Sequence, residues 1–251
     1  MSWHIGVSWA VILTTVGVVT IAAFFQRISG FGFSLLSTPL LTLVMPVEQA
    51  VVALALVSVP NMMLNWREFG PTADKKQVRW ITAWAIPGMP LGLYLLTVLP
   101  ERALKVGVSI CVIGAAILLT ARIRIPAHRV RVVDGVVGFI SGVLNTSTGT
   151  NGPPLVFTFS GQDLSPDRTR GSLAYVFGMS NVVGVSLFAA KGFITADTGL
   201  LALAGMPAIL IGRRLAKPIA ERLTPQNFRR IAIATLVVTG IVGIAKAVIT
   251  G

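Results

Sequence analysis

The feature that most constrains this sequence is a succession of long apolar runs separated by short linkers. A helix of about 20 apolar residues spans the ~30 Å hydrocarbon core of a bilayer, and several runs approach that length. Only 12% of the 251 residues are charged, against about 25% in soluble domains. The sequence therefore predicts an all-α polytopic membrane protein. The runs cover residues 6–25, 31–44, 47–64, 78–98, 103–121, 132–144, 155–159, 173–190, 200–211 and 231–249.

The linkers between these runs carry most of the positive charge. Three of them, residues 67–79, 122–131 and 213–230, are rich in lysine and arginine. Basic linkers stay in the cytoplasm, so these three are predicted to be cytoplasmic and both termini extracytoplasmic. The same bias explains the net charge of +12 without a nucleic-acid partner. The expected location is the cell membrane, in a bacterium the inner membrane.

The sequence offers little that an enzyme would need. His4 and His128 have no partners at metal-ligand spacing, and Cys111 is the single cysteine. There is no nucleophile elbow, no paired intramembrane carboxylates and no phosphate-binding loop. We therefore expect no enzyme activity, no metal, no cofactor and no ATP hydrolysis by this chain.

A polar tract at residues 145–154 interrupts the apolar pattern. It reads Asn-Thr-Ser-Thr-Gly-Thr-Asn-Gly-Pro-Pro, and its glycines and prolines break a helix. A proline suits the first turn of a new helix. Thr148, Thr150, Asn151 and Gly152 then come just before or at a helix start, where hydroxyls and free backbone N–H groups converge. This combination predicts an anion site.

An internal repeat relates the two halves of the chain. Three short matches keep their order, at offsets of 112, 115 and 117 residues, which indicates duplication. The halves are residues 1–125 and 126–251, each a broken or re-entrant helical hairpin plus three transmembrane helices. The basic linkers make corresponding helices run in opposite directions, so the sequence predicts inverted repeats. The matches are Ile28-Ser29-Gly30 with Ile140-Ser141-Gly142, Pro39-Leu40 with Pro154-Leu155, and Gly88-Met89-Pro90 with Gly205-Met206-Pro207.

The first half has its own break, which corresponds to the polar tract. Ser29, Gly30, Gly32 and Ser34 precede Pro39. Two breaks that enter from opposite faces would bring two helix N-termini, each with unpaired N–H donors, to one midplane point. The alternative is that the glycines allow close helix packing and the prolines only kink the helices.

Three further residues complete the candidate substrate site. Arg27 is either a countercharge for the substrate or an end-of-helix residue that snorkels to the interface. Asn61 and Asn181 fall in corresponding helices, and they either face the site or bond to another helix. The candidate set is Arg27, Ser29, Gly30, Gly32, Ser34, Asn61, Thr148, Thr150, Asn151, Gly152 and Asn181.

The two breaks also carry a family resemblance. The chain resembles the TauE/SafE sulfite exporter family, also called the toluene sulfonate uptake permeases, over almost its whole length. It departs from the expected pattern in Gly-Phe-Gly-Phe-Ser at the first break and in Asn-Thr-Ser-Thr at the second. The resemblance implies transport of small sulfur anions such as sulfite or sulfonates. It rests on Ile140-Ser141-Gly142 leading to Gly152-Pro153-Pro154-Leu155-Val156, supported by Ser29, Gly30, Gly32, Pro39 and Leu40.

The functional hypothesis from the sequence is a secondary transporter of small anions. The substrate, a sulfonate, sulfoacetate or sulfite, binds at the midplane between the two broken helices and moves by alternating access. The alternatives are an anion channel of the same fold and a carrier of small carboxylates. Coupling to a proton or a sodium gradient is possible, and the sequence does not identify the ion, because no intramembrane carboxylate relay is evident.

Overall fold

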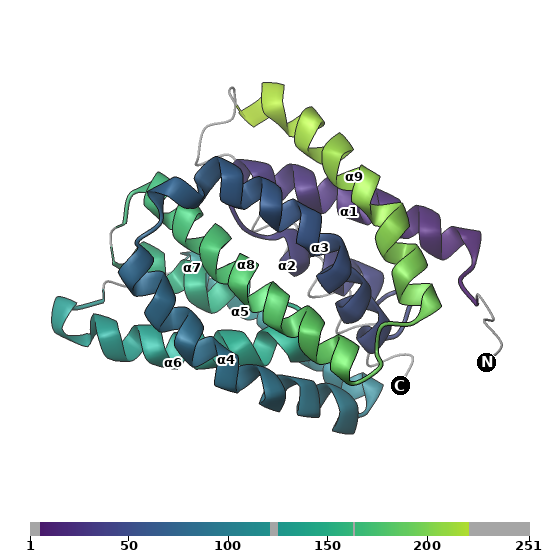
Figure 1. Cartoon of the computed structure of the whole chain (residues 1–251), viewed down its shortest axis with the longest axis horizontal. Helices are drawn as coiled ribbons and strands as arrows, with labels where there is room; N and C mark the ends of the chain where they lie inside the picture. Colours follow the sequence, from purple (N-terminus) through teal and green to yellow (C-terminus); the bar gives the residue numbers. More distant parts are fainter. Residues whose placement is uncertain (1–5, 121–124, 163, 221–251) are drawn as a thin grey trace.

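The computed structural model describes residues 6–120, 125–162 and 164–220. The expected span at residues 231–249, and the linker from residue 221 onward, lie outside this part. Every regular element of the described part is helical (Figure 1). The elements are α1 (Trp9–Ser29), α2 (Phe33–Leu41), α3 (Val47–Phe69), η1 (Gly70–Thr72), α4 (Lys75–Val98), α5 (Glu101–Thr120), η2 (Ala127–Arg129), α6 (Val130–Ser147), α7 (Gly152–Gly161), α8 (Pro166–Ala190) and α9 (Ala196–Ala220).

Five helices, α1, α3, α4, α8 and α9, are long and apolar enough to cross a membrane. The chain is therefore a multi-pass membrane protein, as the runs of apolar residues predicted. Helix α5 was also expected as a span, but part of its C-terminal half lies outside the described side chains, so this span stays a prediction.

The helices α4 and α6 pack closely along each other through glycines. A Cβ atom added to Gly88 or Gly92 of α4 would collide with backbone atoms of α6. A Cβ on Gly138 or Gly142 of α6 would collide in turn with backbone atoms of Ile81 or Ala85. Small residues of this kind let two membrane helices approach backbone to backbone. Successive contacts follow the same chain direction, so the two helices run parallel.

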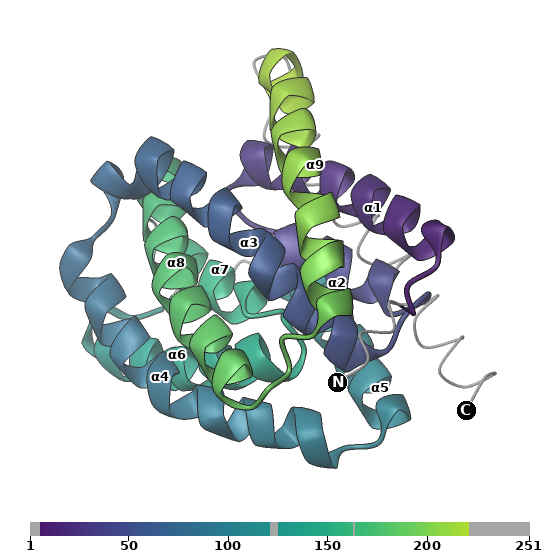
Figure 2. The ribbon, with the colours of Figure 1, turned by 45° about the vertical axis from the view of Figure 1, so that its right-hand side comes forward.

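The helices α1 and α9 form a second parallel pair. A Cβ on Gly212 would fall on the carbonyl of Thr20, and one on Gly205 would lie 3.6 Å from the Cγ2 of Val19. Figures 1 and 2 show this pair on one side of the bundle and the α4–α6 pair on the other, with α3 and α8 between them.

The short helices α2 and α7 lie inside the bundle (Figures 1 and 2). Most side chains of α2 are buried, including Phe33, Leu36 and Leu41. In α7, Leu155 and Phe159 are fully buried. Both helices are too short to span a bilayer, and each follows a break in the preceding helix.

The first predicted break is confirmed, but it is shorter than the sequence suggested. Helix α1 continues through Arg27 to Ser29 and ends at Gly30, whose φ is 81° and whose N–H donates to the carbonyl of Gln26 at 2.7 Å. Gly32, with φ 95°, then precedes α2. Both glycines occupy the left-handed region, which other residues enter at a steric cost.

The second break is confirmed too, and it covers residues 148–151 only. Helix α6 includes Asn145 to Ser147, although these side chains are polar. The hydroxyl of Thr146 donates to the carbonyl of Met89 in α4 at 2.6 Å, and that of Ser147 to Val143 at 2.7 Å. These bonds satisfy the polar groups within the packed helix. The new helix starts at Gly152, one residue earlier than a proline start.

The described parts of the three basic linkers lie at one end of the bundle. Glu68, at the end of α3, binds Arg213 of α9 at 2.6 Å. Trp80, near the start of α4, donates from Nε1 to the carbonyl of Arg131 at 2.9 Å. These contacts place the first linker beside the third, and the start of α4, which follows the first linker, beside the second. We call this the basic end.

Candidate functional site

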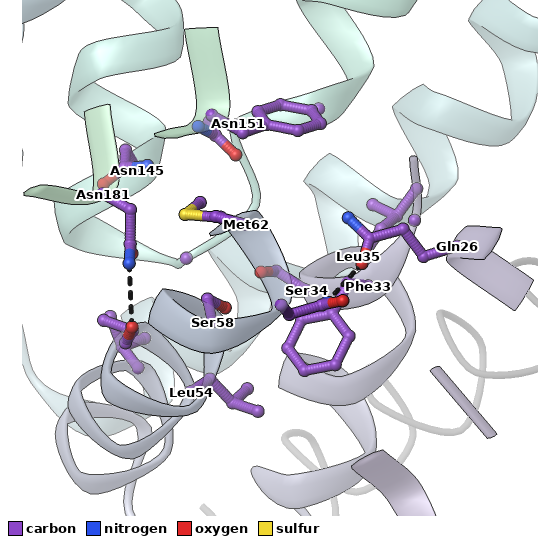
Figure 3. A pocket seen from close by; sticks show the side chains of 17 residues that line it. Gln26, Phe33, Ser34, Leu35, Leu54, Ser58, Met62, Asn145, Asn151 and Asn181 are labelled. Atoms are coloured by element: carbon purple, nitrogen blue, oxygen red, sulfur yellow. Dashed lines mark hydrogen bonds between the residues drawn. The ribbon is translucent and has the colours of Figure 1, made fainter. Parts of the chain in front are cut away.

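The two breaks meet at one small cavity of about 50 Å³. That volume exceeds what a single water requires. Its walls come from α1, α2, α3, the break between α6 and α7, and α8 (Figure 3). The lining residues are Gln26, Gly32, Phe33, Ser34, Leu35, Val51, Leu54, Ala55, Ser58, Asn61, Met62, Asn145, Gly149, Asn151, Gly152, Phe177 and Asn181.

The N-terminus of α2 faces this cavity. The first backbone bond of the helix joins the N–H of Leu36 to the carbonyl of Gly32 at 3.0 Å. The N–H groups of Phe33, Ser34 and Leu35 precede it, so they have no partner inside the helix. No side chain of the described residues caps them. The cavity therefore meets a helix end with a partial positive charge and free donors.

The N-terminus of α7 faces the same cavity with fewer backbone donors. Asn151 and Gly152 both line it, but Pro153 and Pro154 have no N–H to offer. The side chain of Asn151 compensates in part. Its Nδ2 is buried and has no hydrogen-bond partner among the described residues, while Ser141 Oγ donates to the Asn151 carbonyl at 3.1 Å.

Two asparagines, one from α3 and one from α8, lie on the cavity wall. Asn61 donates from Nδ2 to Oε1 of Gln26, and its Oδ1 is buried with no partner in the described part of the chain. Asn181 donates from Nδ2 to the carbonyl of Ala55 at 3.0 Å. Figure 3 shows Asn181 and Asn151 on the far side of the cavity from Gln26 and Ser34.

Six of the predicted site residues line the cavity, four do not, and the side chain of Ser29 is not described. The lining six are Gly32, Ser34, Asn61, Asn151, Gly152 and Asn181. Of the others, Thr148 and Thr150 are buried and their hydroxyl oxygens lie 2.7 Å apart. Gly30 packs against Arg170, since a Cβ there would lie 2.5 Å from the Cγ of Arg170.

The remaining two are at the end of α1. Arg27 forms an ion pair with Glu68 at 2.9 Å, away from the cavity lining. Ser29 is the last residue of α1, and its side chain lies outside the described part of the structure.

Three polar lining residues were not in the predicted set: Gln26, Ser58 and Asn145. Ser58 lies three residues before Asn61, so helical spacing places both on one face. Asn145 opens the polar tract. These two positions carried a usable signal, whereas nothing in the sequence marked Gln26, which precedes a charged residue at a helix end.

The cavity contains no charged side chain among its described lining residues. Its polarity comes from two helix N-termini, asparagine and glutamine amides, and serine hydroxyls. This combination suits a small anion, since N–H donors converge and no carboxylate repels it. No group of three or more potential metal-ligating side chains occurs among the described residues.

An ion-pair cluster lies at the basic end, next to the wall formed by Gln26. Glu68 accepts from Arg27 at 2.9 Å and from Arg213 at 2.6 Å. Arg213 also donates to Oδ1 of Asn65. The cluster joins α1, α3 and α9, and the Arg213 side chain is only 8% exposed. A buried arginine within a candidate span requires such partners.

Comparison with known proteins gives two matches. A family model described as "Sulfite exporter TauE/SafE" matches residues 15–243. A protein of Cupriavidus necator named "Probable sulfite/organosulfonate exporter TauE" is 25% identical over 234 residues, which cover 86% of this chain and 87% of that protein. No solved structure matches the chain.

Proposed function

The chain belongs to the TauE/SafE sulfite exporter family, and we propose that it is a secondary transporter of small sulfur oxyanions. The substrate class is a sulfonate, sulfoacetate or sulfite. The relative's name, which specifies sulfite and organosulfonate, supports this choice. Membrane anion transport is the general activity of the family, and the binding site and mechanism are our proposals.

One observation carries the proposal: two helix N-termini and several neutral polar side chains line the same cavity. An oxyanion spreads its charge over several oxygens, each of which can accept a hydrogen bond from an N–H group. Neutral donors also leave the anion free to depart, which a transporter requires. The proposed substrate contacts are Gly32, Ser34, Asn61, Asn151, Gly152 and Asn181.

The other predicted site residues support this arrangement. We propose that Thr148 and Thr150 fix the tract that presents Asn151, because their hydroxyls bond each other. Gly30 and Ser29 end α1 beside the cavity. Arg27 holds that end to α3 through Glu68, and it contributes positive potential at the basic end.

We further propose that residues 1–125 and 126–251 are inverted repeats that rock about the cavity. The helix pairing supports this: α1 packs on α9, and its counterpart α6 packs on the counterpart of α9, namely α4. The counterparts α3 and α8 pack on each other. In this arrangement the basic end is cytoplasmic and both termini are extracytoplasmic.

Counterflow in proteoliposomes tests the proposed function. A carrier preloaded with unlabelled sulfite or sulfoacetate accumulates labelled substrate from outside, because each half-cycle returns a loaded site. A channel shows no such stimulation, and that result would replace the carrier by an anion channel of the same fold. Competition by short carboxylates but not by sulfonates would instead indicate a carboxylate carrier. Repeating the assay with an imposed proton or sodium gradient identifies the coupling ion.

The alanine variant of Gly32 tests whether the α2 N-terminus contacts the substrate. Alanine at its φ of 95° is strained by about 1–2 kcal/mol, and the strain changes the orientation of the first N–H groups of α2. We expect Gly32→Ala to lower the counterflow rate at least about tenfold, the effect of ~1.4 kcal/mol.

Gly192→Ala is the matched control for that variant. Gly192 also has a positive φ, 74°, and like Gly32 it has no described atom within 4 Å of an added Cβ. It lies after α8, outside the cavity lining. Both variants carry similar strain, so their melting temperatures should fall by similar amounts. Equal transport by the two variants would contradict the assigned role of Gly32.

A further inference from the structure

A second, larger cavity of about 910 Å³ opens at the basic end, between the start of α4 and the start of α6. Four cationic side chains line it: Lys75, Lys76 and Arg79 from α4, and Arg131 from α6. All four are exposed. None of them forms an ion pair with another described residue. Their positive charge is therefore available to a ligand.

The two described carboxylates that line this cavity both have hydrogen-bond partners. Asp74 accepts from the N–H of Gln77 at 3.2 Å and pairs with Arg168 at 3.2 Å. Asp134, which is buried, accepts from the side chains of Gln77 at 2.9 Å and Gln162 at 2.8 Å. The charge of Asp74 is balanced by Arg168, whereas the partners of Asp134 are neutral amides, so the four cations face one unpaired described carboxylate and the cavity keeps an excess of positive charge.

Part of the cavity wall is apolar and aromatic. The guanidinium carbon of Arg131 lies 4.4 Å from the centre of the Trp80 ring, a distance at which a cation and an aromatic ring attract. Ala83, Val130 and Leu164 complete the apolar part of the wall. A tryptophan beside basic residues is typical of the membrane interface.

An exposed apolar stripe continues from the cavity along α4. Trp84 lies one turn after Trp80, which lines the cavity, and Leu91 lies two turns further along the same face. Trp84 is 43% exposed and Leu91 is 44% exposed. Since α4 is a candidate span that begins at Lys75, the cations lie at the membrane surface and the stripe lies at acyl-chain depth.

We propose that this groove binds an anionic phospholipid. Lys75, Lys76, Arg79 and Arg131 hold the phosphate, and an acyl chain lies along the stripe of α4. The charge selects an anionic headgroup, as basic pockets between membrane helices do, and the stripe selects a lipid over a free phosphate. The groove shares no described lining residue with the transport cavity, so this lipid is not the transported substrate.

Thermal melts of the purified, delipidated full-length protein in a mild non-ionic detergent test this proposal. Phosphatidylglycerol at saturating concentration is expected to raise the melting temperature by roughly 4 °C or more. Phosphatidylcholine with the same acyl chains, and inorganic phosphate, should each raise it by less than about 1 °C. An equal shift with phosphatidylcholine, an equal shift with phosphate, or no shift with phosphatidylglycerol would overturn the proposal.

A variant that lacks three of the four cations tests whether the phosphatidylglycerol shift arises from binding at this groove. We expect Lys75→Gln/Lys76→Gln/Arg79→Gln to lose most of the phosphatidylglycerol shift. The matched control, Arg67→Gln/Arg214→Gln/Lys217→Gln, removes the same number of exposed cations from the same end and should keep the shift.

Native mass spectrometry of the same variants measures lipid retention without reference to stability. The first variant should retain fewer phosphatidylglycerol molecules than the control. Equal retention by the two would show that the attraction is a general surface effect and would contradict a defined site.

Discussion

Replacing Gly142 with alanine is expected to destabilise the protein by roughly 3 kcal/mol or more. A Cβ on Gly142 would lie 1.9 Å from the carbonyl oxygen of Ala85. The atom it meets is backbone, so no side-chain rotation relieves the collision, and α4 and α6 must move apart. At about 2–4 °C per kcal/mol for a chain of this size, the melting temperature in detergent should fall by about 6 °C or more.

Gly17→Ala is the control for this prediction. Gly17 also lies within a candidate span, α1, but no described atom lies within 4 Å of an added Cβ. Alanine favours the helix by up to ~1 kcal/mol over glycine, so this variant should melt at or slightly above the wild-type temperature. If Gly142→Ala melted like Gly17→Ala, the close contact between α4 and α6 would be wrong.

Replacing Glu68 with glutamine is expected to cost about 2–3 kcal/mol. The carboxylate of Glu68 is the shared partner of Arg27 and Arg213, and glutamine would leave both cations without a countercharge. Breaking a fully buried pair costs about 3–5 kcal/mol. Here the Glu68 side chain is 33% exposed, and solvent screening lowers the cost.

Two further variants test whether the stability cost of Glu68→Gln comes from the ion pairs of Glu68. Glu101→Gln removes a carboxylate from the pair with Lys105, where the Glu101 side chain is 46% exposed, so it should cost less than about 0.5 kcal/mol. Glu68→Gln/Arg213→Gln removes the buried cation as well and should recover part of the lost stability. Additive costs in this double variant would show that the two residues do not interact.

The positions of the helix breaks could be predicted because their signals are local. Gly30 and Gly32 adopt positive φ angles, and the second break ends at Gly152 with two prolines after it. Both properties belong to residue types rather than to distant contacts. The exact ends were less predictable. Thr146 remains helical because it bonds to Met89 of another helix, which a linear sequence does not reveal.

The repeated Gly-Met-Pro motif has a structural explanation that the sequence alone did not indicate. A Cβ on Gly88 would meet the carbonyl of Phe139, and one on Gly205 would lie 2.9 Å from Val57. Both glycines therefore lie where two helices pack tightly. The repeat was visible in the sequence, but its packing partners lie about 50 residues or more away in the chain.

Part of the candidate site was predictable from the local signals of the breaks, as for Gly32 and Asn151, and part from the predicted repeat, as for Asn61 and Asn181. All four residues line the cavity. Arg27 forms its ion pair with Glu68, which is 41 residues away in the chain. The hydrogen bond between the Thr148 and Thr150 hydroxyls depends on the turn at Gly149, which lies between them. Such contacts arise from tertiary structure, so sequence patterns cannot assign them.

The N-terminus of α2 offers more backbone N–H donors to the cavity than the N-terminus of α7, which the sequence did not suggest. The polar tract before α7 was the richer candidate in composition, but prolines remove two of its N–H groups. The N–H groups of Phe33, Ser34 and Leu35 all remain available beside the cavity. We therefore expect the two halves to contribute differently: backbone donors from α2, and side-chain donors from Asn151 and Asn61.

The most direct test of the central claim is equilibrium binding of sulfite or sulfoacetate to the purified protein. Asn61→Ala and Asn151→Ala should each raise the Kd at least about tenfold, because a hydrogen bond to a charged group contributes ~1.5–3 kcal/mol. Thr158→Val is the control, since Thr158 Oγ1 is also buried without a described partner but does not line the cavity, and its Kd should stay within about twofold. A Kd unchanged in both asparagine variants would contradict an anion site between the two helix breaks.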